Sequence, residues 1–302
     1  MTGRGQRSVT PPQRDRRLDP GLWIVATPIG NARDITLRAL DVLRDADVLV
    51  CEDTRRTRNL LDLHGIAIGG RPVLSYNDHS GDGRRTAILD HVGAGKTVAY
   101  ASDAGTPLIA DPGYRLVEAC HDRGFQVHTA PGPSAVTASL ALGGLPTDRF
   151  LFAGFLPARK SARRRELETL SKVPATLVVF ESGRRLTATL ADISAVFGEA
   201  HTVCVARELT KRFEEVLTRP VSALISDLGE TGDPKGEIVL LIDRLSAGHD
   251  AADVAERAEI LVAAGLADGR SVRDVADEVS GQTGLPRKAV YRMALSLLNA
   301  GR

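Results

Sequence analysis

The stretch LWIVATPIGN at residues 22–31 places five apolar residues, a run of strand length, directly before a loop that contains threonine, proline and glycine. A segment with helical periodicity follows at 35–46, and another short apolar run follows at 48–51. The alternation continues, with strands expected at 97–101 and 126–129 and helices at 55–64, 83–92 and 113–123. Strands that alternate with helices predict a mainly parallel sheet that is buried on both faces.

A second alternating series follows the sequence PGP at 131–133 and a helix expected at 134–142. Its strands are expected at 150–153, 176–180, 202–206, 214–218 and 237–242, and its helices at 161–170, 184–196 and 221–228. Beyond Asp243 only helices are expected, including one at 250–264, one opened by a capping box of Ser271 and Asp274, and one that begins at Pro286. The last two resemble a helix-turn-helix unit, and a plain helical hairpin that packs on the main body is the open alternative.

These elements divide the chain into four expected segments. They are a disordered basic tail over 1–20, an N-terminal α/β domain over 21–143, a second α/β domain over 144–245 and a helical domain over 246–302. With 302 residues, 43% of them hydrophobic and a net charge of +1, the chain can build ordinary cores, which excludes global disorder.

Composition also narrows the location and the chemistry. The tail carries five arginines and three prolines but no apolar region of a signal peptide, and no apolar run reaches the roughly 18 residues of a membrane helix. Three separated cysteines, Cys51, Cys120 and Cys204, argue against a zinc site or a disulfide framework. We therefore expect a cytoplasmic protein without a metal and without membrane attachment.

Three loops follow expected parallel strands directly. They are TPIGN at 27–31, EDTR at 52–55 and SDAGTP at 102–107. Since the carboxyl ends of parallel strands meet at one edge, where open α/β sheets bind ligands, these loops predict a binding site there. Each loop alone could be ordinary turn chemistry.

The sequences of these loops resemble those of the tetrapyrrole methylase superfamily. Within it, the chain is similar to the branch that methylates a ribose 2′-hydroxyl of a decoding-centre cytidine in 16S (small-subunit) ribosomal RNA, and the match covers about residues 20–243. The resemblance implies an α/β protein with a cofactor cleft between two α/β domains, plus a small C-terminal helical domain. Two departures stand out, ESGRR at 181–185, where the family usually has ESPHR, and NDH at 77–79, where it usually has a His-Glu-type pair.

The same resemblance implies S-adenosylmethionine as the cofactor and names residues for it. The implied cofactor-binding residues are Pro28, Ala101, Ser102, Asp103, Thr106, Ser134, Ala135, Phe180, Ala206, Arg207 and Glu208. Glu52 and Asp53 are the candidates for orienting or deprotonating the ribose hydroxyl. An N-cap, or a salt bridge to Arg55 or Arg56, is the structural alternative for these two carboxylates.

Two arginine clusters are candidates for contacting RNA phosphates. They consist of Arg55, Arg56 and Arg58, and of Arg163, Arg164 and Arg165, and a solvated helix face is the alternative for each. The expected partner is 16S ribosomal RNA within the small subunit, and the expected assembly is a homodimer. Two functional alternatives stay open, a tetrapyrrole C-methyltransferase and a non-enzymatic RNA-binding assembly factor.

Overall fold

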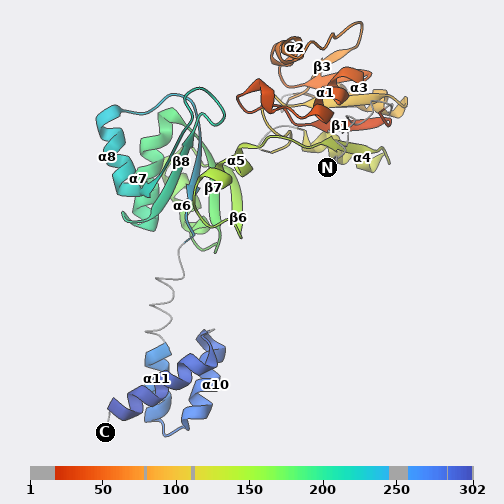
Figure 1. Cartoon of the computed structure of the whole chain (residues 1–302). Coiled ribbons are helices and arrows are strands. Elements are labelled where there is room, and N and C mark those ends of the chain that lie inside the picture. Colours follow the sequence, from red (N-terminus) through yellow and green to blue (C-terminus); the bar gives the residue numbers. More distant parts are fainter. Residues whose placement is uncertain (1–17, 78–79, 110–112, 245–257, 284, 301–302) are drawn as a thin grey trace, which may run out of the picture.

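The computed structural model describes residues 18–77, 80–109, 113–244, 258–283 and 285–300. Most of the expected tail therefore lies outside the described residues. Two sheets with flanking helices form the main body, and a set of helices follows at the C-terminal end (Figure 1). No helix among the described residues is both long and apolar enough to span a membrane.

The first sheet is parallel throughout, as the alternation predicts. Its order is β3-β2-β4-β1-β5, and every pairing in it is parallel. The strands are β1 (Gly21–Val25), β2 (Val48–Cys51), β3 (Val73–Ser75), β4 (Thr97–Ala101) and β5 (Val127–Ala130). The helices are α1 (Leu37–Asp45), α2 (Thr54–Leu63), α3 (Asp82–Gly93) and α4 (Tyr114–Asp122), with a short 3-10 helix η1 (Ala32–Asp34). Apolar clusters cover both faces, which explains why β2 and β4 read as continuous apolar runs.

The second sheet is mixed rather than parallel. Its order is β6-β7-β10-β8-β9, and within it only β6 and β7 pair in parallel. Its strands are β6 (Phe150–Phe155), β7 (Thr176–Ser182), β8 (Thr202–Arg207), β9 (Glu215–Pro220) and β10 (Glu237–Ile242). Its helices are α6 (Lys160–Leu170), α7 (Leu186–Phe197) and α8 (Val221–Thr231), with a 3-10 helix η2 (Gly183–Arg185). β8 and β9 are antiparallel neighbours with no helix between them, and β10 enters the middle of the sheet.

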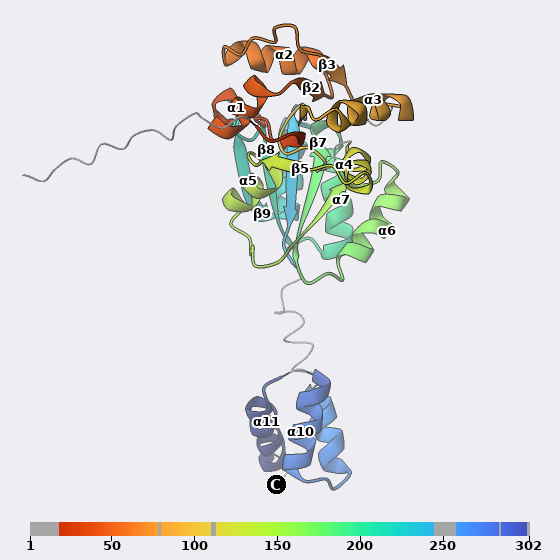
Figure 2. The same ribbon diagram turned by 90° about the vertical axis from the view of Figure 1, so that its right-hand side faces the viewer.

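Helix α5 (Ala135–Leu142) packs with the second sheet, although the expected boundary at 143 assigned it to the first domain. The helix lies beside the strands of that sheet (Figure 2), and Val136 and Leu140 belong to one apolar cluster with residues of β7, β8 and β10. At its end, a Cβ on Gly143 would lie 2.3 Å from Leu241 Cδ1, so any larger residue there would have to displace this buried leucine side chain. The boundary between the packing units therefore lies ahead of α5, near residues 131–134.

The C-terminal helices form a core of their own. Residues 258–267 are helical and are followed by α10 (Val272–Thr283) and α11 (Arg287–Ala300). Their apolar cluster contains Val262, Val275 and Val290 and, within the described part of the chain, no residue of either sheet. The N-cap half of the expected capping box is confirmed, since Ser271 Oγ accepts a hydrogen bond of 3.2 Å from the backbone N–H of Asp274.

Candidate active site

Two of the three predicted loops are joined directly at the edge of the first sheet. The backbone N–H of Thr27 donates to the Gly105 carbonyl at 2.8 Å, and the N–H of Gly105 donates back at 3.0 Å. The hydroxyls of Thr27 and Ser102 donate to the carbonyls of Ser102 and Gly105 at 3.1 and 2.9 Å. These bonds fix the loops TPIGN and SDAGTP against each other, as expected for a binding rim.

A pocket of about 380 Å³ lies between the loops of the first sheet and the second sheet. A volume in this range is typical of small-molecule and cofactor sites. The lining residues are Ile29, Ala104, Gly105, Thr106, Ile109, Ser134, Ala135, Phe155, Phe180, Glu181, Ser182, Ala206, Leu209, Gly236, Glu237, Ile238 and Val239. We call this the interdomain pocket.

Apolar groups form much of its wall on the side of the second sheet. The rings of Phe155 and Phe180 meet edge to face at 5.6 Å. Gly105 and Gly236 both have positive φ angles, 78° and 115°. A Cβ on Gly236 would lie 2.6 Å from the Glu208 carboxylate, so at this position the lining is bare backbone.

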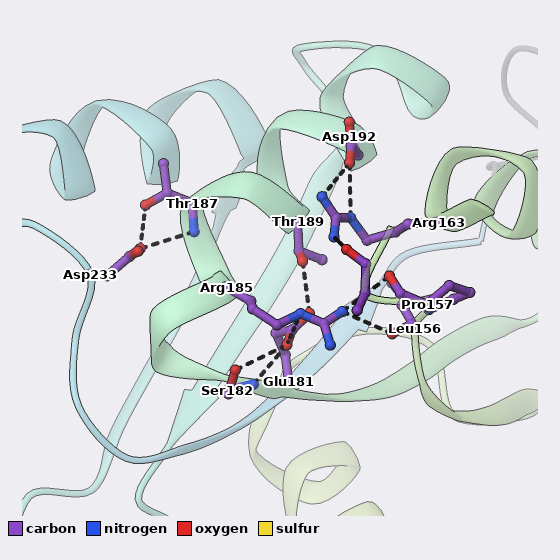
Figure 3. A network of polar contacts seen from close by, with 11 residues as sticks. Leu156, Pro157, Arg163, Glu181, Ser182, Arg185, Thr187, Thr189, Asp192 and Asp233 are labelled. Atoms are coloured by element: carbon purple, nitrogen blue, oxygen red, sulfur yellow. Dashed lines mark hydrogen bonds and ion pairs between the residues drawn. The ribbon is translucent and has the colours of Figure 1, made fainter. Parts of the chain in front are cut away.

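Glu181 lies at the end of β7, beside the interdomain pocket, and its carboxylate is buried on the α7 side of the sheet (Figure 3). Its side chain accepts hydrogen bonds from the Ser182 N–H at 2.8 Å and from the Thr189 hydroxyl at 2.7 Å. Arg185 lies 3.2 Å from the same carboxylate and also donates to the Leu156 carbonyl at 2.8 Å. Arg185 therefore ties the end of β7 to the end of β6, which are two walls of one pocket.

A second acidic group, Glu237, is held by an ion-pair triad. Lys211 Nζ lies 2.8 Å from Glu237 and 2.9 Å from Glu208. Burial would lower the pKa of Lys211, but the hydrogen bonds to both carboxylates raise it above its usual value. A hydrogen bond from the Glu237 N–H, together with Lys211, lowers the pKa of Glu208. Lys211 and Glu208 are thus held in their charged forms near neutral pH.

The loop that carries Lys211 also contacts the first domain. Glu208 and Thr210 have φ angles of 49° and 62°, a conformation that is an outlier for a β-branched residue such as threonine. Thr210 Oγ1 accepts a hydrogen bond from the Asn31 N–H at 3.0 Å. The strained loop therefore joins the loop TPIGN to the second sheet, beside the interdomain pocket.

A smaller pocket of about 210 Å³ lies on the first domain alone. Helix α2 forms one side of it, and the two joined loops form the other. Its lining residues are Thr27, Pro28, Gly30, Ala32, Arg56, Thr57, Asn59, Leu60, Leu63, Ser102 and Asp103. We call this the α2 pocket.

The residues predicted to bind cofactor divide among three places. Thr106, Ser134, Ala135, Phe180 and Ala206 line the interdomain pocket, whereas Pro28, Ser102 and Asp103 line the α2 pocket. The remaining three, Ala101, Arg207 and Glu208, line neither pocket. Ala101 is buried in the first core, Arg207 pairs with Glu215 at 3.2 Å, and Glu208 belongs to the triad described above.

Asp53 adopts the structural alternative. It caps α2 by accepting a hydrogen bond from the Arg55 N–H at 2.8 Å, and it pairs with the Arg55 side chain at 2.9 Å. The hydrogen bonds from the side chain and backbone of Arg55 lower the pKa of Asp53 to about 2. A carboxylate with so low a pKa is a weak general base near neutral pH. Glu52 is half-buried and lines neither pocket.

The two arginine clusters differ in exposure. The side chains of Arg55 and Arg56 are 89% and 64% exposed, and Arg58 on the same helix is exposed as well. Arg163, by contrast, is 4% exposed and pairs with the buried Asp192 at 2.7 Å (Figure 3).

The expectation that Arg163 contacts RNA is therefore wrong. Arg163 shares the buried face of α6 with Leu167 and Leu170, at helical spacing. Arg164 also pairs with Asp192, at 2.6 Å, but remains 41% exposed, and Arg165 is exposed. In this cluster only Arg164 and Arg165 can reach a ligand outside the protein.

Comparison with known proteins places the chain in a family. Residues 21–225 match the family described as tetrapyrrole (corrin/porphyrin) methylases, and residues 251–298 match the RsmI C-terminal HTH domain. A curated protein of Mesorhizobium japonicum named "Ribosomal RNA small subunit methyltransferase I" is 43% identical over 282 residues, which covers 93% of this chain and 94% of that protein. The chain belongs to the ribosomal RNA small subunit methyltransferase I family.

Further members of this family match this chain over nearly all of their own length. The protein of the same name from Escherichia coli O157:H7 is 40% identical over 276 residues, which cover 91% of this chain and 94% of that protein. That from Thermotoga maritima is 46% identical over 221 residues, which cover 73% of this chain and 97% of that protein.

Solved structures at lower identity share the fold. A cobalt precorrin-4 methyltransferase superposes with a TM-score of 0.55 at 21% identity, covering 74% of this chain and 94% of that chain. A uroporphyrin-III C-methyltransferase from Thermus thermophilus, complexed with S-adenosyl homocysteine, superposes with a TM-score of 0.51 at 19% identity. The superposition covers 73% of this chain and 96% of that chain.

One of the two sequence departures has a structural explanation. A Cβ on Gly183, where the family pattern usually has proline, would lie 1.8 Å from the Pro234 carbonyl oxygen. The loop at 233–236 thus approaches η2 so closely that only glycine fits at position 183. Arg184 is exposed, and Asp78 and His79 of the other departure lie outside the described residues.

Sequence reasoning missed several residues that line the interdomain pocket, among them Glu181, Leu209, Gly236 and Glu237. Glu181 stands in the family motif at 181–185, which was a usable signal. Gly236 and Glu237 carried no such signal in the sequence. They lie at the pocket because β10 occupies the middle of the second sheet, between β7 and β8.

Proposed function

We propose that this chain uses S-adenosylmethionine to methylate the ribose 2′-hydroxyl of a cytidine in the decoding centre of 16S ribosomal RNA. The observation that carries the proposal is the family membership over nearly the whole length of the curated relatives. The pocket between the two α/β domains supports it, because this is where the resemblance places the cofactor. The substrate is proposed to be the small subunit, and the protein is proposed to act as a cytoplasmic homodimer.

The residues of the interdomain pocket fit S-adenosylmethionine, which when bound supplies a methyl group on a positively charged sulfonium. Phe155 and Phe180 offer apolar surface for an adenine ring. Glu237 brings a carboxylate, paired with Lys211, to a pocket that would hold a cation. The hydroxyls of Ser134 and Ser182 and the backbone at Gly105 and Gly236 suit the polar groups of the cofactor.

Positioning is the main contribution that these residues can make to the rate. The leaving group of a sulfonium is already activated, so alignment of donor and acceptor can supply up to about 7–11 kcal/mol in favourable cases. The Thr210–Asn31 hydrogen bond and the Arg185 contacts hold the walls of the pocket in place. Asp53 then acts by ordering α2, and Glu52 stays the candidate for orienting the hydroxyl.

The tetrapyrrole alternative is not favoured, because the curated relatives are named for ribosomal RNA. A side-by-side comparison of the two substrates tests this point. Small subunits that lack the modification and uroporphyrinogen III are offered separately, each with methyl-labelled S-adenosylmethionine. We expect label in the ribosomal RNA alone, and label in the tetrapyrrole alone would contradict the proposal.

A further inference from the structure

The α2 pocket has a chemical character different from that of the interdomain pocket. One side carries a guanidinium group from Arg56, an amide from Asn59 and the apolar side chains of Leu60 and Leu63. An Asn amide has both hydrogen-bond donors and an acceptor, and an Arg guanidinium can stack on a base or pair with a phosphate. Cation, amide and apolar surface together match an unstacked nucleotide, which proteins bind by stacking and by hydrogen bonds to the base edge.

The position of the α2 pocket is tied to that of the interdomain pocket. Pro28 and Gly30 line the α2 pocket, while Ile29, between them, lines the interdomain pocket. Likewise, Asp103 lines the α2 pocket and the next residue, Ala104, lines the interdomain pocket. The two pockets therefore adjoin across two loops, which the Thr27–Gly105 bonds hold together. Because the acceptor oxygen must come within about 3–3.5 Å of the transferred methyl group, the nucleotide that carries it has to be anchored next to the cofactor pocket.

Arg56 is oriented but not saturated. Its Nε lies 3.5 Å from Asp103 Oδ2, and its side chain is 64% exposed. Asp103 is itself fixed, since Oδ1 accepts a hydrogen bond of 3.0 Å from the Asp53 N–H. Arg55, in contrast, uses both Nε and Nη2 on Asp53. Of the three arginines on α2, Arg56 alone lines the pocket.

We propose that the α2 pocket holds the target nucleotide of the RNA, with Arg56 and Asn59 as its recognition residues and Asp103 as the residue that positions Arg56. This inference rests on the proposed function and adds the place of the acceptor to it. Cytosine presents an acceptor at N3 beside an amino donor, which is complementary to the amide of Asn59. Leu60 and Leu63 cover the apolar part of the nucleotide.

The test compares Arg56→Met with Arg84→Met. Both residues are exposed on helices of the first domain and both variants lose one positive charge, but Arg84 lies on α3 and does not line the pocket. We expect Arg56→Met to raise the KM for small subunits about 10-fold or more, as for loss of a charged hydrogen bond, and Arg84→Met to raise it less than about 3-fold. The Kd for S-adenosylmethionine should match wild type in both, which also shows that both variants are folded.

A second variant tests the recognition of the base. Single-stranded oligoribonucleotides that differ only in cytidine or uridine at the target position are titrated into wild type and Asn59→Leu. Wild type should prefer the cytidine oligonucleotide, and Asn59→Leu should lose that preference while it retains its affinity for S-adenosylmethionine.

Three results would overturn the inference. They are equal effects of Arg56→Met and Arg84→Met, an unchanged preference in Asn59→Leu, and a weaker Kd for S-adenosylmethionine in Arg56→Met, which would assign the α2 pocket to the cofactor. The proposed function fails separately, if wild type does not methylate small subunits. In that case the oligonucleotide titrations still decide whether the pocket binds a nucleotide.

Discussion

The buried ion pair between α6 and α7 yields the sharpest stability prediction. Asp192 contacts Arg163 at 2.7 Å and Arg164 at 2.6 Å, and the side chains of Asp192 and Arg163 are 1% and 5% exposed. Asp192→Asn removes the negative charge and leaves the Arg163 guanidinium buried without a counter-charge. Breaking a buried pair in this way costs about 3–5 kcal/mol. Arg165→Met, an exposed change on the same helix, should stay within about 0.5 kcal/mol.

The assay has to separate the two α/β domains. The single tryptophan, Trp23, lies on β1 and reports on the first sheet, so its fluorescence in urea should change little in Asp192→Asn. Hydrogen exchange of the backbone amides in α6 and α7 reports on the second sheet and should lose protection corresponding to about 3–5 kcal/mol. A loss below about 1 kcal/mol would refute the reasoning that this pair is structural.

The same ion pair predicts how the stability of the second α/β domain changes with pH. Burial alone would raise the pKa of Asp192, but the hydrogen bonds from Arg164 and Arg163 lower it below its usual value. A carboxyl whose pKa is lower in the folded state stabilises the fold above its unfolded pKa of about 3.9 and loses that contribution as the pH falls through the folded value. Wild type should therefore lose protection in α6 and α7 on acidification below about pH 4, and Asp192→Asn should lack that step.

Three further predictions concern the pocket walls. Arg185→Met should weaken S-adenosylmethionine binding about 10-fold or more, because it releases Glu181 and the Leu156 carbonyl together. The control variant Arg163→Met should destabilise α6 but leave the Kd for S-adenosylmethionine unchanged. Equal Kd values for the two variants, measured by calorimetry, would contradict this prediction. Gly183→Pro, although it restores the usual family residue, should destabilise the second domain in urea titrations, since a Cβ there meets the Pro234 oxygen at 1.8 Å; a gain in stability would show that the loop at 233–236 moves freely. Asp53→Asn should retain activity between pH 5 and 9, because asparagine also caps helices and the Asp53 pKa of about 2 lies far below that range; a fall in kcat with unchanged melting would make Asp53 a catalytic group after all.

Local patterns in the sequence determined much of the first domain. Its apolar strands run directly into the loops TPIGN, EDTR and SDAGTP, and parallel strands bring such loops to one edge by geometry. β3 escaped prediction because it has three half-buried residues and no apolar run. β8, β9 and β10 were expected as strands, but their antiparallel order depends on pairings between segments that are distant in sequence, which composition cannot indicate.

The candidate site shows the same limit. Thr106, Ser134, Ala135, Phe180 and Ala206, which were predicted to bind the cofactor because each stands in or beside a recognisable motif or strand end, line the interdomain pocket, and their role stays a prediction. Arg163 was misassigned because a run of three arginines suggests an exposed basic patch, while helical spacing turns one of the three toward the core. The division of the rim into two pockets depends on which way alternate residues of a loop face, and that information is absent from the sequence pattern.

One product analysis tests the proposed methylation of 16S ribosomal RNA most directly. Small subunits that lack the modification are incubated with the protein and S-adenosylmethionine, and the 16S ribosomal RNA is digested to nucleosides for mass spectrometry. We expect a new 2′-O-methylcytidine that maps to the decoding centre and that disappears when Ala104→Trp, a change at an exposed residue of the lining, fills the interdomain pocket. A methyl group on a base, or no methylated nucleoside from a wild-type protein that binds S-adenosylmethionine, would contradict it.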